Sequence, residues 1–297
     1  MAKKIICFGE MLWDVFPDAE IAGGAPLNVA IHLKQLGCDV ELISKVGKDT
    51  LGEGLIAFCK SFDLSTRLIQ TDDLRPTGKV IVDNSQIENI KYDIVYPAAW
   101  DYITIDDTNL KAVDAADLMI FGSLGIRNEV TWHSLQTLVK QHLIKVFDIN
   151  LRAPYIDFQK IDTLLQYTNI LKINEDEMEI LTGHYGVIFG PDHSAFDFCK
   201  YFADRFSLNT ICITLGGKGA MVDQNGEIIH HEGYKVVVKD TVGAGDAFLG
   251  GFVKMYLEGK SPEEIIDFSC SLGAYVASQK GGTPRYDPTQ LNGIKRT

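Results

Sequence analysis

The sequence predicts an α/β protein in which a central, mostly parallel sheet carries helices on both faces and a small β lid is added. Short apolar runs rich in β-branched residues alternate along the chain with amphipathic segments, which is the pattern of consecutive strand–helix–strand units. Residues 77–96 interrupt this alternation with two strand-like runs. No linker, repeat or low-complexity tract divides the chain, so we expect a single domain over residues 1–297.

Six apolar runs are expected to form the strands of the main sheet. They cover residues 5–8, 40–46, 118–121, 144–149, 170–173 and 211–214. Because helical segments separate most of these runs, the strands should be largely parallel and covered on both faces. A later hairpin is expected with Asn225 and Gly226 at its turn.

Helix starts are indicated by proline, by capping residues and by glycine turns. Pro26 suits the first turn of a helix that reaches about Leu36 and is closed by Gly37. An apolar helix is expected over about residues 244–256. Further helix starts are indicated at Asp106, Glu129, Asn174 and Ser261.

The two strand-like runs of the interrupted region cover residues 78–83 and 90–96. In the second run, one face would carry Ile90, Tyr92, Ile94 and Tyr96. A two-stranded ribbon is only marginally stable by itself. We therefore expect this ribbon to lie on the main body as a lid, to pair with a second subunit, or both.

Composition limits the partners that the chain can bind. The formal net charge is −12 and the isoelectric point is near 5.0, so neither a nucleic-acid surface nor an anionic-membrane surface is expected. The apolar run near the amino terminus is too short for a signal peptide, and no run approaches a membrane span. Six cysteines without C-x-x-C spacing are expected to be reduced, as in a cytoplasmic protein.

The segment from Asp240 to Asp246 carries the strongest chemical signal. Its residues Gly243, Ala244 and Gly245 let a polyanion approach the backbone, and the following helix points unpaired N–H groups at the same place. A carboxylate there would repel a phosphoryl group unless it takes the proton from an attacking hydroxyl. Asp246 is therefore a candidate base. The alternative is an ordinary helix start with an acid in its first turn.

A second polar segment, residues 148–152, ends an apolar strand. The period of two would put Asp148, Asn150 and Arg152 on one face at the carboxyl end of the strand, where ligands of open α/β sheets bind. The guanidinium of Arg152 suits a phosphate or a polar substrate. The alternative is a polar strand exit that makes turn hydrogen bonds.

Asn174 and Glu177 follow the next strand and lie three residues apart at the start of a helix. This spacing puts both side chains on one helical face, where their oxygens could bind Mg²⁺ directly or through water. Acids in the first turn of a helix are also favoured by the helix dipole, which is the alternative explanation.

A glycine turn with Gly216 and Gly219 follows Thr214 at a strand end and leads into another strand. It lacks the spacing of a P-loop and is not followed by a helix. Such a turn suits either a plain hairpin or a hairpin beside a nucleotide. The sequence leaves both possibilities open.

Near the amino terminus, Asp14 follows the first strand and Asn28 lies one turn into the first long helix. Their side chains could bind the hydroxyls of a polyol. Turn and cap chemistry is the alternative. It explains the neighbouring glycines, but it gives Asn28 no task.

Together these residues resemble the ribokinase-like, or PfkB, family of carbohydrate kinases, over nearly the whole chain and in the family's order. One signature is the segment 22–28 with Gly37 and Gly47 downstream, and the other runs over residues 240–251 with Asp246 inside. The resemblance implies the ribokinase-like sheet with helices on both faces. It also implies a lid formed by segments near residues 11–24 and 77–102.

The resemblance implies roles for single residues. Asp246 would be the catalytic base, and the N–H groups of Gly243, Ala244 and Gly245 would form the anion hole for the γ-phosphate of ATP. Asp240, with the loop 276–282, would hold a monovalent cation such as K⁺. Asn174 and Glu177 would position Mg²⁺ and the phosphates, with Glu177 acting through water. The nucleotide would be held by Thr214, Gly216 and Gly219. The sugar would be held by Asp14, Gly24 and Asn28.

Within the family the chain looks most like bacterial fructokinases, which implies D-fructose phosphorylated at its 6-hydroxyl. Arg152 would join the sugar site, with Trp100 and the ribbon as walls. The alternatives are a 2-keto-3-deoxygluconate kinase or a ribokinase, since the two-glycine start occurs in both. A catalytically silent sugar or nucleotide sensor on the same fold is disfavoured by the intact Asp246. A Rossmann dehydrogenase is disfavoured because no G-x-G-x-x-G follows the first strand.

The expected partners are a small sugar and ATP, with a second copy of the chain. The apolar face of the ribbon is a poor surface to leave in water, and several relatives pair their lids. We therefore expect a homodimer formed through the lid.

Overall fold

A computed structural model of the chain describes residues 3–83, 91–188 and 194–294. The chain folds into two compact units, residues 1–142 and 143–297, and each is described by itself. Within the described residues, no helix combines the length and the apolar character that crossing a bilayer requires. The single kinase domain expected over residues 1–297 stays a prediction.

The first unit contains a parallel sheet in the order β8-β1-β4-β5. Its strands are β1 (Lys4–Phe8), β4 (Asp39–Gly47), β5 (Ile69–Asp72) and β8 (Leu118–Gly122). Three of them confirm the strands expected at residues 5–8, 40–46 and 118–121, and β5 is additional. Fully buried side chains such as Ile5, Ile6 and Leu42 make this sheet part of the core.

The helices of the first unit are α1 (Ala25–Gln35), α2 (Thr50–Ser61), α3 (Asp107–Asp114) and α4 (Glu129–Leu138), with the short 3₁₀ helices η1 (Ala99–Tyr102) and η2 (Leu124–Ile126). Helices α1, α3 and α4 start where local signals predicted, and α2 is additional. Pro26 lies in the first turn of α1, and Gly37 follows its end with a left-handed φ of +77°. Asp106 caps α3 by accepting the N–H of Asn109.

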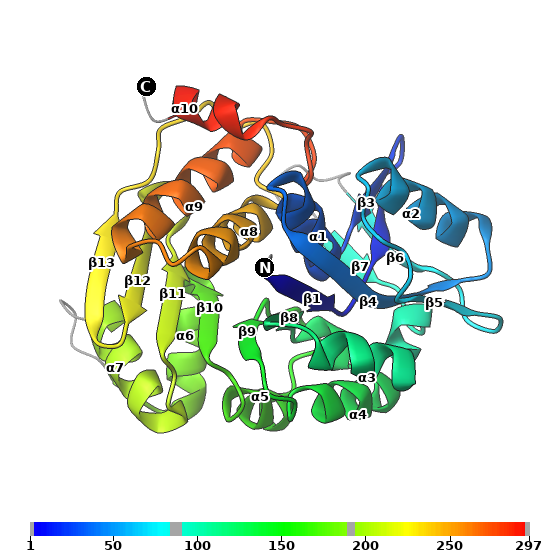
Figure 1. Cartoon of the computed structure of the whole chain (residues 1–297), viewed down its shortest axis with the longest axis horizontal. Coiled ribbons are helices and arrows are strands. Elements are labelled where there is room, and N and C mark those ends of the chain that lie inside the picture. The colour runs from blue at the N-terminus through cyan, green and yellow to red at the C-terminus, as the bar shows by residue number, and fades with distance from the viewer. Residues whose placement is uncertain (1–2, 84–90, 189–193, 295–297) are drawn as a thin grey trace. The chain divides into compact units, whose positions relative to one another are not determined.

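A second, smaller sheet of four strands belongs to the first unit (Figure 1). In spatial order its strands are β3 (Glu20–Gly23), β2 (Leu12–Val15), β6 (Gly78–Asp83) and β7 (Lys91–Ile94). The expected ribbon is thus confirmed as β6 and β7, with β2 parallel to β6 at one side. On the expected apolar face Tyr92 and Tyr96 are exposed and Ile94 is buried, whereas Ile90 lies outside the described residues.

The second unit carries a mixed sheet in which three parallel strands continue into an antiparallel hairpin. In order its strands are β9 (Ile144–Asp148), β10 (Ile170–Asn174), β11 (Thr210–Thr214), β12 (Ala220–Gln224) and β13 (Glu227–His231). The hairpin between β12 and β13 turns at Asn225 and Gly226, as expected. Both residues have positive φ, +55° and +88°, which is the conformation of a two-residue hairpin turn.

Helices lie on both faces of this second sheet (Figure 1). They are α5 (Phe158–Leu165), α6 (Glu175–Tyr185), α7 (Ser194–Phe206), α8 (Ala244–Leu257), α9 (Pro262–Ala277) and α10 (Leu291–Ile294), with the 3₁₀ helices η3 (Gly216–Lys218) and η4 (Pro288–Gln290). Helices α6 and α7 contact β11, whereas α9 contacts β12 and β13 and packs along α8. The α/β fold class is therefore confirmed, with mainly parallel strands and helices on both faces.

Candidate active site

Helix α8 begins in a tight glycine turn. Gly243 caps the helix with a left-handed φ of +74°, and a Cβ there would stand 2.5 Å from the backbone of Gly282. Glycine avoids both the strained dihedral angle and the clash. Asp246 lies in the first turn and is half-buried. The structure thus confirms the predicted helix start and puts a carboxylate beside the N–H groups at the amino end of α8.

Asp240 ties this turn to the loop that follows α9. Its Oδ1 accepts the N–H of Val242 at 3.0 Å, and its Oδ2 accepts the N–H of Gly281 at 3.1 Å. The backbone N–H of Asp240 in turn donates to the carbonyl of Ala277 at 3.3 Å. The two segments predicted to hold a monovalent cation therefore lie together. The cation itself stays a prediction.

The structure adds a buried cation to this site, the ammonium of Lys172 on β10. Lys172 is 5% exposed, and Asp148 is its register partner on β9. The Nζ atom lies 2.9 Å from Oδ1 and 3.1 Å from Oδ2 of Asp148. It also lies 3.3 Å from the place where a Cβ on Gly245 would stand. A lysine ammonium therefore lies next to the first turn of α8.

The charge of Lys172 is held by surrounding carboxylates. Burial by itself would lower the pKa of this ammonium, but the nearby carboxylates outweigh burial and raise it. These carboxylates belong to Asp148, Glu177 and Asp246. The sequence analysis gave Lys172 no role. Its one signal was a charged residue inside an apolar strand, and the Asp148 carboxylate that pairs it lies 24 residues away.

Asn174 and Glu177 form a reciprocal cap at the start of α6. Asn174 Oδ1 accepts the N–H of Glu177 at 2.8 Å, and Glu177 Oε2 accepts the N–H of Asn174 at 2.9 Å. Glu177 Oε1 accepts the N–H of Leu151 at 2.8 Å, so the same carboxylate also fixes the chain after β9. Burial and the charge of Asp148 raise the pKa of Glu177. The shared helical face predicted from the spacing is confirmed.

Strand β9 ends before two of the residues that were predicted to alternate along it. It stops at Asp148, and Asn150 has a left-handed φ of +45°. The prediction that Asp148, Asn150 and Arg152 share one strand face is therefore wrong, because the alternation of side chains ends with the strand. Arg152 is exposed, and its Nη1 donates to the carbonyl of Leu151 at 2.9 Å.

The glycine turn after Thr214 is present as the short helix η3. Gly216 and Gly219 both have positive φ, +57° and +91°. A Cβ on Gly219 would stand 1.9 Å from the carbonyl oxygen of His231, so the end of β13 packs directly on the turn. Thr214 Oγ1 donates to the carbonyl of Ile173 at 3.3 Å. The hairpin is confirmed, and its role toward a nucleotide stays a prediction.

Three of the predicted sugar residues lie together in the first unit. Gly24 caps α1 with a φ of +105°, and a Cβ there would stand 2.6 Å from the carbonyl oxygen of Glu10. A Cβ on Gly23 would stand 2.6 Å from Asp14 Oδ2, so this carboxylate lies against the glycine pair. Asn28, 5% exposed, donates its N–H to the carbonyl of Gly24 at 2.9 Å. Arg152, the fourth, belongs to the second unit.

The loop after β7 is anchored by a buried ion pair. Arg127 makes two contacts with the carboxylate of Asp101, at 2.6 and 2.9 Å, and both side chains are at most 1% exposed. Arg127 also donates to the carbonyl of Val95 at 2.8 Å and lies 4.0 Å from the ring centroid of Trp100. Trp100 is 0% exposed, so its ring supports this loop and does not form the wall of the sugar site that was expected.

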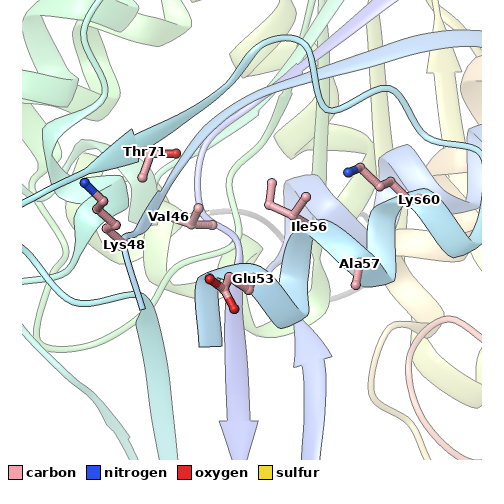
Figure 2. Close-up of a pocket in the computed structure, with 9 residues that line it drawn as sticks. Val46, Lys48, Glu53, Ile56, Ala57, Lys60 and Thr71 are labelled. Atoms are coloured by element: carbon pink, nitrogen blue, oxygen red, sulfur yellow. The ribbon is translucent and has the colours of Figure 1, made fainter. Parts of the chain in front are cut away.

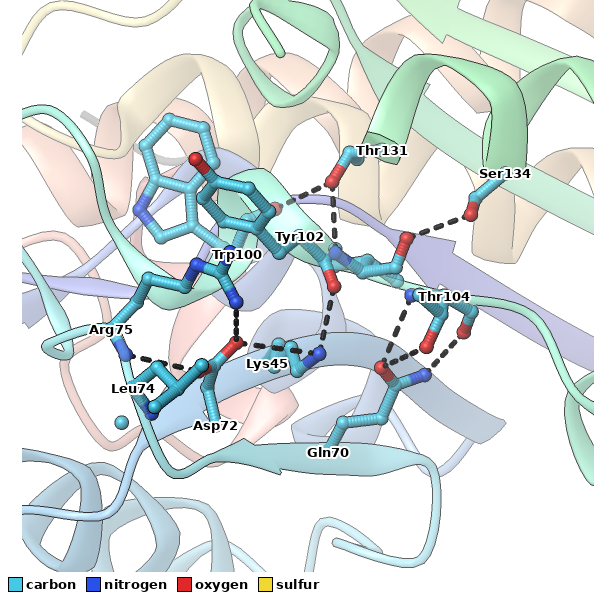
Figure 3. A network of polar contacts seen from close by, with 12 residues as sticks. Lys45, Gln70, Asp72, Leu74, Arg75, Trp100, Tyr102, Thr104, Thr131 and Ser134 are labelled. Atoms are coloured by element: carbon cyan, nitrogen blue, oxygen red, sulfur yellow. Dashed lines mark hydrogen bonds and ion pairs between the residues drawn. The ribbon is translucent and has the colours of Figure 1, made fainter. Parts of the chain in front are cut away.

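Polar contacts extend this anchoring to the main sheet and to α4 (Figure 3). Lys45 on β4 donates to the carbonyl of Tyr102 at 2.8 Å, and Arg75 lies 3.7 Å from the ring centroid of Tyr102. Thr131 Oγ1 on α4 donates to the carbonyl of Trp100 at 2.9 Å. Ser134 on the same helix donates to the carbonyl of Ile103 at 2.7 Å. The end of the predicted lid segment is therefore firmly attached to the first unit.

The structure also contains two surface hollows. The first, of about 420 Å³, lies between α2 and the ends of β4 and β5, and Lys48, Glu53 and Lys60 line it (Figure 2). The second, of about 470 Å³, lies in the second unit between α7 and the β12–β13 hairpin. Neither is lined by a residue of the predicted active site.

The family model and the similar proteins all point to carbohydrate kinases. The chain matches the model of the pfkB family carbohydrate kinases over residues 2–289. A sugar kinase of Pyrococcus horikoshii, described as uncharacterized, is 29% identical over 280 residues, with 89% of this chain and 84% of that protein covered. The fructokinase of Escherichia coli is 26% identical over 302 residues, with 95% of each covered.

Solved structures share the fold. The Pyrococcus horikoshii kinase in complex with ATP has a TM-score of 0.82 at 25% identity and covers 97% of this chain and 99% of its own. A fructokinase double mutant of Vibrio cholerae O395, bound to fructose, ADP and potassium ion, has a TM-score of 0.82 at 20% identity. The match covers 99% of this chain and 98% of that chain. At that identity the likeness shows the fold alone. Since the family model spans nearly all of its residues, this chain belongs to the pfkB family of carbohydrate kinases.

Proposed function

We propose that the chain is an ATP-dependent sugar kinase that transfers the γ-phosphoryl group of ATP to a primary hydroxyl of a small sugar. The observation that carries this proposal is the carboxylate of Asp246 in the first turn of α8, behind the glycine cap at Gly243. The N–H groups of a helix start attract an anion, and a carboxylate accepts a proton. Phosphoryl transfer to a hydroxyl needs both groups at one place.

In this mechanism Asp246 accepts the proton of the sugar hydroxyl as the hydroxyl oxygen attacks the γ-phosphorus. The new P–O bond forms in line with the breaking bond between the γ-phosphorus and the oxygen of the β-phosphate, and ADP leaves. The N–H groups of Gly243, Ala244 and Gly245 hold the charge of the transferring group. They are fixed by the helix, so they do not reorganise during the reaction.

Asn174 and Glu177 are the residues that would position Mg²⁺. Each oxygen of Glu177 accepts one backbone N–H and keeps a lone pair for a water molecule. Within the described part of the chain, no group of three or more His, Cys, Asp or Glu side chains is arranged to hold a metal ion. This donor set fits Mg²⁺ held through water together with the phosphates of ATP. When bound, the ion neutralises phosphate charge.

The nucleotide and a monovalent cation are assigned to the turns that flank α8 and η3. Thr214, Gly216 and Gly219 would contact ATP, because glycines with positive φ bring the backbone close to a ligand. Asp240 and the loop 276–282 would hold K⁺, since hydrogen bonds already join these two segments. The ATP-bound relative supports the nucleotide assignment.

For the acceptor we propose D-fructose, phosphorylated at its 6-hydroxyl to give fructose 6-phosphate. A neutral ketohexose needs carboxylate and amide partners for its hydroxyls, which Asp14 and Asn28 supply beside Gly24. A keto-acid sugar would also need a dedicated cation. Arg152 could provide one, so 2-keto-3-deoxygluconate is the main rival, and ribose is the next.

A substrate panel tests this choice. We expect kcat/KM for fructose to exceed the values for ribose, 2-keto-3-deoxygluconate and adenosine. A rival that exceeds fructose by more than about tenfold, roughly 1.4 kcal/mol of transition-state binding, would overturn the fructose assignment and leave the kinase assignment intact.

A catalytically silent sensor on the same fold remains the alternative of a different class. An assay of ADP release from ATP in the presence of each sugar of the panel distinguishes the kinase from the sensor. Turnover with any one sugar excludes the sensor. Binding of ATP and sugar without ADP release would favour it.

We also propose that the chain works as a homodimer joined through the small sheet, in the cytoplasm. Tyr92 on β7 is 56% exposed, and Tyr96 after the strand is 51% exposed, which leaves apolar surface for a second copy. The six cysteines are free thiols, as a reducing compartment would keep them.

A further inference from the structure

We propose that Lys172 is a further catalytic residue, whose ammonium contacts the γ-phosphoryl group of ATP, and that Asp148 is the positioning residue that holds it there. This inference rests on the proposed function, since it concerns the same phosphate site. It adds a side-chain cation to an anion hole that was predicted to consist of backbone N–H groups.

The position of the ammonium supports this role. Nζ of Lys172 lies 3.3 Å from where a Cβ on Gly245 would stand, so it lies beside the first turn of α8. The N–H groups of that turn are the predicted anion hole. An anion that they bind would therefore lie near the full positive charge of Lys172, and we propose a direct hydrogen bond between the two.

The hydrogen bonds of Lys172 leave room for a ligand. A lysine ammonium has three N–H donors. Within the described residues, its acceptors are the two oxygens of Asp148, at 2.9 and 3.1 Å. At least one N–H is therefore left without a protein acceptor at 5% exposure, where an unpaired donor is costly. A phosphoryl oxygen would satisfy it.

The charges around the site require such a cation. Three carboxylates interact with Lys172, those of Asp148, Glu177 and Asp246. They would repel the transferring phosphoryl group. The amino end of a helix supplies only about half an elementary charge against them. The full charge of Lys172, fixed by the register pairing of β9 and β10, supplies attraction at the same turn.

The experiment compares the binding of ADP with that of a non-hydrolysable ATP analogue with an imido bridge, because the two ligands differ by the γ-phosphate. Calorimetry with Mg²⁺ present gives both dissociation constants for the wild type, for Lys172→Met and for the double variant Asp148→Asn/Lys172→Met. The double variant guards against misfolding, since it removes both members of the buried ion pair and leaves neither of them as an unpaired charge. Lys145→Met, a half-buried lysine at the other end of β9, is the matched control.

We expect both Lys172 variants to weaken binding of the ATP analogue at least about tenfold while the affinity for ADP stays within about threefold, and kcat to fall at least about tenfold. Lys145→Met should change none of these values. Equal losses for both ligands, or unchanged binding of the analogue in the double variant, would reduce Lys172 to a structural role and overturn the inference. A wild type that binds neither nucleotide would overturn the proposed function as well.

Discussion

The predicted phosphate site and the predicted sugar site are built in different ways. In the second unit three charged side chains are buried: Lys172 donates to Asp148, and Glu177 accepts backbone N–H groups. In the first unit, Asp14 is half-buried and lies against a glycine pair on the edge of the small sheet. Transfer of a phosphoryl group makes the same demand for every acceptor, so a rigid site suits it. The choice of sugar depends on a few side-chain contacts, and the sequence therefore indicates the type of reaction more sharply than it indicates the substrate.

The sharpest test of the phosphate site is Asp246→Asn. We expect kcat to fall at least about 10²-fold while the affinity for ADP stays within a few-fold, because a general base acts in the transition state and adds little to ground-state binding. Steady-state kinetics and calorimetry measure the two quantities. Glu258→Gln, an exposed carboxylate just after the other end of α8, is the control. Turnover near the wild-type value would remove Asp246 from the mechanism.

The second prediction concerns Glu177. The two carboxylate oxygens of Glu177 accept one N–H each, from Leu151 and Asn174. In Glu177→Gln one of these oxygens is replaced by an N–H₂ group, which cannot accept a hydrogen bond, so one of the two contacts is lost. We expect the Mg²⁺ concentration for half-maximal rate to rise about tenfold or more, the size typical of lost metal-positioning contacts. A titration of activity with Mg²⁺ measures it, and Asp176→Asn, the exposed neighbour, is the control. An unchanged Mg²⁺ requirement would argue against a metal role for Glu177.

The sugar site is tested by Asp14→Asn. A hydrogen bond from a sugar hydroxyl to a carboxylate contributes about 1.5 kcal/mol or more, so KM for the sugar should rise about tenfold. KM for ATP should stay within about twofold, since the variant leaves the second unit unchanged. Asp18→Asn, in the exposed turn between β2 and β3, serves as the control. A rise in KM for ATP alone would contradict the division of the site into two regions.

The smallest kinetic effect is expected for the lid surface. Replacing Tyr92 by Glu should convert a dimer into a monomer by light scattering and change kcat only a few-fold, because Tyr92 does not belong to the predicted phosphate site. Leu74→Glu, an exposed apolar residue outside the small sheet, is the control. A wild type that is already monomeric at micromolar concentration would refute the lid dimer.

The local structure around the predicted phosphate site could be predicted from the sequence because its signals are local. The residues of the cap, Asn174 and Glu177, are three positions apart, and so are Gly243 and Asp246 at the ends of the glycine turn. Capping and helix starts depend on neighbouring residues, so spacing alone identifies them. The same rule explains why Pro26 and Gly37 gave the limits of α1 within one or two residues.

The sequence by itself determined the α/β class, the pfkB resemblance and the candidate base, since each rests on short segments. Only the tertiary structure decided that Lys172 pairs with Asp148, because that contact depends on the register of two strands 24 residues apart. It also decided that β9 stops at Asp148, where the left-handed Asn150 turns Arg152 out of the strand pattern. The burial of Trp100 beneath Arg127 is decided in the same way, by packing between segments that share no local signal.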